Sequence, residues 1–163
     1  MLSVFPQASG EAGVRQTLSK MAGLVRASKL DPAIRDQAAL AISGCEKGNK
    51  ICHCAALLSW TNRKIRYVAD PQGVELLHDP RLIARAIAGK KLVYGDCDDM
   101  SVYLAALLAS VGLAPILRAV GYNGANLSHV YVVCCGLNLD PTRDAWNVSY
   151  RPHVETWVVE ERV

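Results

Sequence analysis

The sequence has no long apolar run, no internal repeat and no low-complexity linker, and these absences narrow its class. A membrane-spanning helix needs about 20 consecutive apolar residues, and no segment approaches that length. The first ten residues lack the basic start and long apolar stretch of a secretory signal. We therefore expect a single soluble domain over residues 1–163, without membrane association, in a cytoplasmic or virion-associated location.

Aromatic residues are few, at 6% of the chain. Residues 1–93 carry fourteen Lys and Arg against seven Asp and Glu, whereas residues 94–163 carry four against eight. Nucleic-acid surfaces combine clustered basic residues with aromatic ones, but here the basic residues are spread over several predicted helices without interleaved aromatics. This pattern favours a solvated basic surface over a nucleic-acid interface.

Hydrophobic periodicity predicts helices first and strands last. Apolar residues spaced by three and four indicate helices, and two Asp-Pro pairs are typical helix openings, because aspartate caps the first turn and proline tolerates it. This order predicts an α+β fold, with a helical part over about 11–93 and a helix packed on an antiparallel sheet over about 95–160. The predicted elements are helices over about 11–27, 32–43, 47–62, 80–89 and 97–111, strands over 65–68, 116–120, 127–135, 137–140 and 157–159, a turn at 70–73 and a loop at 121–126.

The sequence GDCDD at positions 95–99 runs directly into one of these helices and carries the candidate nucleophile. It places Cys97 in the first turn, where unpaired backbone N–H groups and the helix dipole favour an anion and predict a lowered thiol pKa. The alternative is a buried structural cysteine. One helical face is predicted to be apolar, through Met100, Leu104, Leu107, Leu108 and Val111.

A thiolate nucleophile needs a base within hydrogen-bond reach, and the base needs an acceptor that fixes its tautomer. His129 lies in a predicted strand, and Asp140 ends the next one. If these strands pair through a turn at Gly136, the histidine and the aspartate lie on one face, close enough to interact. Each alone is typical of a structural residue, but together with Cys97 they predict a catalytic triad.

The chain resembles the transglutaminase-like cysteine enzymes in the order of these residues and in their local sequences. The resemblance implies a papain-like α+β core, with Cys97 as nucleophile, His129 as general base and Asp140 as the residue that orients it. It covers about residues 50–142, and its upstream part looks like the form of this domain found among bacteriophage and prophage proteins. The residues that carry it are GDCDD at 95–99, GLAP at 112–115 with Arg118, HVYV at 129–132, LDPT at 139–142 and, upstream, Trp60, IRY at 65–67 and Asp70-Pro71.

The sequence indicates only one of the two hydrogen-bond donors expected in an oxyanion hole. The Cys97 backbone N–H is one expected donor, but the chain has no plain upstream Gln or Trp for the second. Many family members also have an aromatic residue shortly after the histidine, where this chain has Val130 and Tyr131. The candidates for the second donor or for substrate contacts are Trp60, Asn62, Tyr67 and Tyr94.

The carboxylates of Asp96, Asp98 and Asp99 lie close to the Cys97 thiol in the sequence and oppose its ionisation. A positive charge nearby should offset them. An imidazolium at His129 would do so. A calcium ion held by Asp96 and Asp98 would also do so, and some periplasmic proteases of this superfamily have acidic residues that flank the cysteine in this way. A calcium site takes about six to eight oxygens, and only two or three are evident here. We therefore favour no metal and expect that no cofactor is required.

The chain has six cysteines, at positions 45, 52, 54, 97, 134 and 135. Without a secretory signal, we expect reduced thiols rather than a disulfide framework. Cys52 and Cys54 lie on a predicted helix and diverge by about 200°, which favours core thiols over a zinc site. Cys134 and Cys135 are expected to point to opposite faces of a strand.

These features predict a bacterial or phage thiol enzyme, a cysteine protease, amidase or acyltransferase. It would cleave or transfer acyl groups of amide or peptide bonds in a protein or peptide substrate, with hydrolysis favoured over cross-linking. The alternative is a non-catalytic structural or assembly protein of a phage or prophage particle, in which the same fold is only a scaffold.

Overall fold

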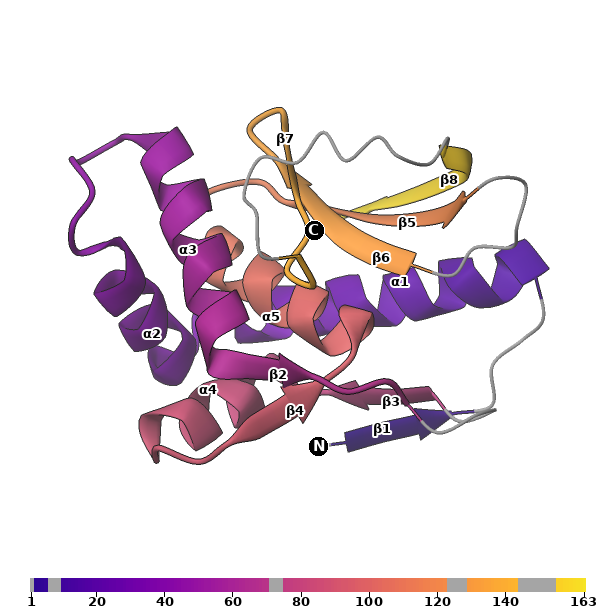
Figure 1. Ribbon diagram of the computed structural model, residues 1–163, viewed down its shortest axis with the longest axis horizontal. Coiled ribbons are helices and arrows are strands. Elements are labelled where there is room, and N and C mark those ends of the chain that lie inside the picture. The colour runs from indigo at the N-terminus through magenta and orange to yellow at the C-terminus, as the bar shows by residue number, and fades with distance from the viewer. Residues whose placement is uncertain (1, 6–9, 71–74, 123–128, 144–154) are drawn as a thin grey trace.

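Figure 1 shows the computed structural model of the protein, which describes residues 2–5, 10–70, 75–122, 129–143 and 155–163. The predicted turn at 70–73 and loop at 121–126 lie largely outside these residues. The helices are α1 (Gly10–Ser28), α2 (Pro32–Ile42), α3 (Lys50–Lys64), α4 (Pro80–Ala88) and α5 (Cys97–Ser110). The strands are β1 (Leu2–Phe5), β2 (Ile65–Tyr67), β3 (Glu75–His78), β4 (Val93–Gly95), β5 (Ile116–Tyr122), β6 (His129–Cys134), β7 (Leu137–Leu139) and β8 (Glu155–Arg162).

The main sheet is antiparallel, with the strand order β7-β6-β5-β8. The C-terminal strand lies at its edge, as predicted, and the α+β class is confirmed. Two further pairs were not predicted in full: β1 pairs with β3 antiparallel, and β2 pairs with β4 parallel. Strands of three or four residues carry too little alternation to be recognised from the sequence.

Helix α5 lies at the centre of the molecule, between the main sheet and the two small strand pairs (Figure 1). The prediction of one apolar face is too narrow, because every residue from Asp98 to Leu108 is buried. Helices α1, α2 and α3 and strand β6 contact α5 from several directions, so it has no solvent face along this length. A helix buried on all sides holds its first residue, Cys97, in a fixed position.

The helix openings follow the predicted capping chemistry. Asp31 accepts a hydrogen bond from the Ala33 backbone N–H at 2.9 Å, and Asp79 accepts one from Arg81 at 2.9 Å. Proline follows each aspartate in the first turn. Across the described ranges, no helix is both long and apolar enough to cross a membrane.

The expectation of reduced thiols is wrong for Cys45 and Cys52, which form a disulfide with Cα atoms 5.8 Å apart. Helix α3 begins at Lys50, later than predicted, because the Asn49 side chain caps it by accepting a hydrogen bond from the Cys52 N–H at 3.0 Å. Cys52 lies in the helix, as predicted, but in its first turn, beside the connection from α2. The disulfide closes this short α2–α3 connection.

Candidate active site

Cys97 is the first residue of α5, after Asp96, whose side chain accepts hydrogen bonds from the N–H groups of Asp98 at 3.0 Å and Asp99 at 3.3 Å. Its half-buried thiol lies 3.5 Å from Asp98 Oδ1. Burial, followed by the charges of Asp98 and Asp96, raises the pKa of Cys97 well above its ordinary value. The prediction of a lowered pKa is therefore wrong, because burial and two carboxylates outweigh the helix N-terminus.

Strand β6 is held against the start of α5 by two contacts with Val130. Ser101, one turn after Cys97, donates a hydrogen bond from Oγ to the Val130 carbonyl oxygen at 3.1 Å. The Val130 N–H forms a hydrogen bond with the Cys97 sulfur and opposes the rise of its pKa. His129, the residue before Val130, is thereby placed beside the first turn of α5. The one sequence signal for this contact is a serine on an otherwise apolar helix.

The structure brings His129 and Asp140 together across the β6–β7 pair. His129 Nε2 lies 2.7 Å from Asp140 Oδ2, and both side chains are largely buried. The other carboxylate oxygen accepts hydrogen bonds from Thr142, from its N–H at 3.0 Å and its hydroxyl at 2.7 Å. Burial raises the pKa of Asp140, but His129 and Thr142 outweigh it and lower the pKa overall. An ionised Asp140 accepts the Nε2 proton and leaves Nδ1 as the basic nitrogen.

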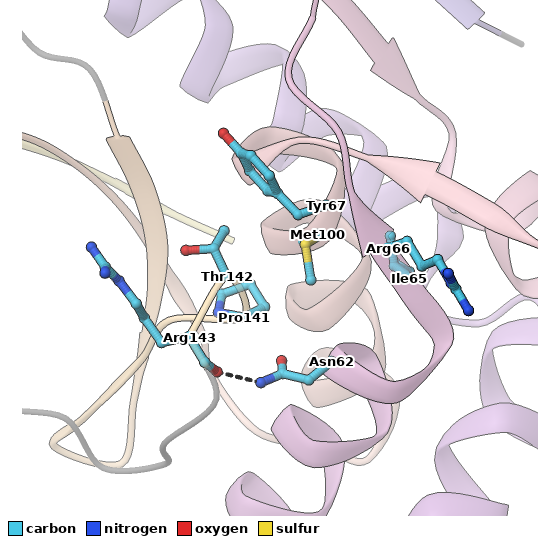
Figure 2. Close-up of a pocket in the computed structure, with 8 residues that line it drawn as sticks. All are labelled: Asn62, Ile65, Arg66, Tyr67, Met100, Pro141, Thr142 and Arg143. Atoms are coloured by element: carbon cyan, nitrogen blue, oxygen red, sulfur yellow. Dashed lines mark hydrogen bonds between the residues drawn. The ribbon is translucent and has the colours of Figure 1, made fainter.

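A cavity of about 350 Å³ lies beside the segment that directly follows Asp140 (Figure 2). Met100, one turn after Cys97, lines it together with Tyr67, whereas the three residues of the predicted triad are not among its lining residues. Asn62 donates a hydrogen bond from Nδ2 to the Arg143 carbonyl oxygen and ties α3 to that segment. The cavity is therefore a candidate substrate cleft. It is lined by Asn62, Ile65, Arg66, Tyr67, Met100, Pro141, Thr142 and Arg143.

Of the four candidate oxyanion or substrate residues, Asn62 and Tyr67 line this cavity. Burial and then the nearby Cys97 raise the pKa of Tyr67, so its phenol lies within electrostatic reach of the thiol. Trp60 instead packs against the core, with Lys64 Nζ 4.7 Å from its ring centroid. Tyr94 is exposed on β4 and is not among the residues that line the cavity.

A second histidine–aspartate pair lies on the other side of the α5 start and was not predicted. The His78 backbone N–H donates to Asp99 Oδ1 at 2.7 Å, and its ring Nδ1 lies 2.8 Å from Oδ2. Contact with His78 offsets part of the negative charge that Asp96, Asp98 and Asp99 place near Cys97. Burial nevertheless raises the pKa of Asp99. His78 precedes an ordinary Asp-Pro helix opening, so its sequence context gave no sign of this contact.

The sulfur of Cys97 and one oxygen each from Asp96 and Asp98 lie within 4.8 Å of one another. Two carboxylate oxygens are far fewer than the roughly six to eight oxygen ligands of a calcium site. The expectation that no metal or other cofactor is required therefore stays a prediction.

Asp96→Asn is expected to stabilise the protein at pH 7.5 but not at pH 4. Burial and then Asp99 raise the pKa of Asp96 from 3.8 to about 6, so ionisation of this carboxyl costs stability as pH rises through this window. Asparagine caps a helix about as well as aspartate and carries no charge. We expect a gain on the order of 1–3 kcal/mol at pH 7.5.

Urea unfolding of both proteins at the two pH values measures this effect. Asp36→Asn, at an exposed position of α2, is the control and should change stability equally at both pH values. A gain for Asp96→Asn that is the same at pH 4 and pH 7.5 would contradict the raised pKa.

Comparison with known proteins gives one informative likeness. No family model matches the chain, and no curated protein matches it. Its structure is similar to the crystal structure of a "putative cysteine protease from Cytophaga hutchinsonii", with a TM-score of 0.50 and 14% sequence identity. The match covers 97% of this chain and 54% of the other, so the chain spans about half the length of that protein. The chain therefore has a cysteine-protease-like α+β fold.

Proposed function

We propose that the protein is a thiol enzyme that cleaves or transfers acyl groups of amide or peptide bonds through Cys97, His129 and Asp140. The observation that carries this proposal is the 2.7 Å contact between His129 and the buried Asp140, in a strand whose next residue, Val130, contacts the Cys97 sulfur. A base with a fixed tautomer beside a thiol at a helix start is the arrangement that nucleophilic acyl transfer needs.

The raised pKa of Cys97 means that the thiol is protonated before substrate binds. In the proposed reaction, His129 Nδ1 accepts the thiol proton as Cys97 Sγ bonds to the carbonyl carbon. The Cys97 backbone N–H stabilises the negative oxygen. His129 then gives the proton to the leaving amine, and a thioester forms. Water or a second amine next attacks the thioester and regenerates the thiol.

The proposed substrate is a protein or peptide, and hydrolysis is favoured over cross-linking. The cavity beside the segment after Asp140 has a mixed lining, with polar residues such as Asn62 and Thr142 and apolar residues such as Met100 and Pro141. Such a mixed lining suits an amide or peptide group with an aliphatic neighbour. We propose that the reaction needs no cofactor.

One observation favours the alternative of a non-catalytic scaffold. Asp98 and Asp96 both raise the pKa of the Cys97 thiol, and a thiol that never ionises is inert. In this alternative the fold serves an assembly role, and its use in a phage or prophage particle stays a prediction.

An activity-based probe that alkylates the reactive cysteine separates these two functions. A peptide acyloxymethyl ketone at pH 7.5 is expected to label Cys97 at least 10-fold faster than any other free cysteine, because His129 deprotonates the thiol as it attacks. Peptide mapping locates the label, and Cys97→Ser is the variant that should lose it. Cys54→Ser is the matched control and should label normally. Labelling that is equal at Cys97 and Cys135 would contradict the enzyme proposal.

A further inference from the structure

Three cysteines outside the candidate active site meet at the other end of β6. Cys54 comes from α3, Cys134 ends β6 and Cys135 follows it in the turn to β7. Their sulfur atoms all lie within 4.8 Å of one another, and the Cys134 and Cys135 sulfurs are 3.8 Å apart. Cys54 and Cys134 are buried, whereas Cys135 is exposed. The cluster therefore has two fixed thiols and one that solvent reaches.

The turn conformation explains why the adjacent cysteines lie together. Cys135 has a φ of 53° and Gly136 a φ of 77°, so two successive residues adopt the left-handed region, as in a type I′ hairpin turn. The expectation that one of the two cysteines points inward and the other outward is confirmed by their burial, but Cys135 lies in the turn and not on the strand. Asn, Asp and Gly are the usual residues in the left-handed region, so a cysteine there is strained.

We propose that Cys54, Cys134 and Cys135 form a three-thiolate site for a thiophilic d10 metal ion, either Zn²⁺ or Cu⁺. Metal–sulfur bonds of about 2.3 Å place the sulfurs of a tetrahedral site about 3.8 Å apart and those of a trigonal site about 4.0 Å apart. The Cys134–Cys135 sulfur distance of 3.8 Å matches the tetrahedral value, and the other two pairs of sulfur atoms lie within 4.8 Å of each other. Thiolates are the ligands that select these soft ions.

The surroundings of the cluster suit this chemistry. The positive charge of Lys50, one helical turn before Cys54, acts on Cys135 and would offset part of the negative charge of a metal–trithiolate. The exposed Cys135 gives the ion an entry path. On binding, the ion displaces the remaining thiol protons to solvent.

The proposed site is separate from the triad. His129 and Cys134 are the two ends of β6, so about 17 Å of strand lies between them. On α3, Cys54 lies eight residues before Asn62, which lines the cleft. The ion would therefore crosslink α3 to the β6–β7 hairpin and stabilise the fold, and it would not take part in acyl transfer.

The test uses the full chain with Cys45→Ser, Cys52→Ser and Cys97→Ala, which leaves the cluster as its three remaining cysteines. Titration with Co²⁺, a spectroscopic substitute for zinc, should saturate at one ion per chain and give thiolate-to-metal charge-transfer absorption. Titration with Cu⁺ against a chromophoric chelator is the second arm. Further replacement of Cys54 or Cys135 by Ser should weaken binding at least 100-fold in whichever arm binds.

Intense visible bands of tetrahedral Co²⁺ would assign the site to zinc with water as a fourth ligand, and tight binding of Cu⁺ alone would assign it to copper. Failure of both ions to bind, or binding that Cys135→Ser leaves unchanged, would overturn the proposal. A second measurement uses the wild-type chain, in case the triple variant does not fold. Cd²⁺ should slow alkylation of Cys135 at least 10-fold and leave that of Cys97 unchanged, and equal alkylation with and without Cd²⁺ would also overturn it.

Discussion

His129→Ala is expected to slow probe labelling of Cys97 by about 10³-fold or more, while the protein stays folded. The raised pKa of Cys97 makes this dependence strong, because a thiol that is protonated at rest needs a base at the moment of attack. The measurement is the rate of labelling by the peptide acyloxymethyl ketone at pH 7.5. Thermal unfolding of the same samples shows whether the variant is folded.

His78→Ala is the matched control, because His78 also contacts a buried aspartate at nearly the same distance, 2.8 Å against 2.7 Å. It should retain probe labelling of Cys97 within about threefold, since Asp99 is not the residue that accepts the proton of the proposed base. It should lose about 1–3 kcal/mol of stability, because Asp99 is left buried without its ring partner. If the two variants slow labelling equally, the assignment of His129 as the base is wrong.

Local chemistry explains why the helix starts and the His129–Asp140 contact were predictable. The aspartate caps at Asp31 and Asp79 act within their own turn, so the sequence contains everything that places them. The β6–β7 pair is joined by a short turn at Gly136, which fixes the register to within one residue. Both kinds of prediction depend on contacts between residues close together in the chain.

Two features that the sequence did not reveal depend on contacts between distant residues. Helix α3 is far in sequence from β6, so only the folded chain shows that Cys54 meets the Cys134–Cys135 turn. The sign of the pKa shift at Cys97 failed for a related reason. A helix N-terminus is visible in the sequence, but the depth of burial, which dominates that shift, is set by the elements packed around it.

Gly95→Ala is expected to destabilise the protein by about 3 kcal/mol and to lower its Tm by roughly 5–10 °C. A Cβ at this position would lie 2.7 Å from Asp99 Cβ and 2.9 Å from Asp99 Oδ2. These atoms cannot easily move, because Asp99 is buried in the first turn of α5 and holds His78 through two hydrogen bonds. The added methyl must therefore displace the start of α5 or break the contact with His78.

Since Cys97 lies two residues after Gly95, displacement of the α5 start should also slow probe labelling of Cys97. Differential scanning calorimetry and the probe-labelling rate measure the two effects. Gly23→Ala, in helix α1, is the matched control, because an added Cβ there meets nothing within 4 Å. It should leave labelling unchanged and stabilise the protein by roughly 0.5–1 kcal/mol, since alanine favours a helix over glycine. Similar Tm values for Gly95→Ala and the wild type would show that the start of α5 accommodates the methyl and is less rigid than its packing indicates.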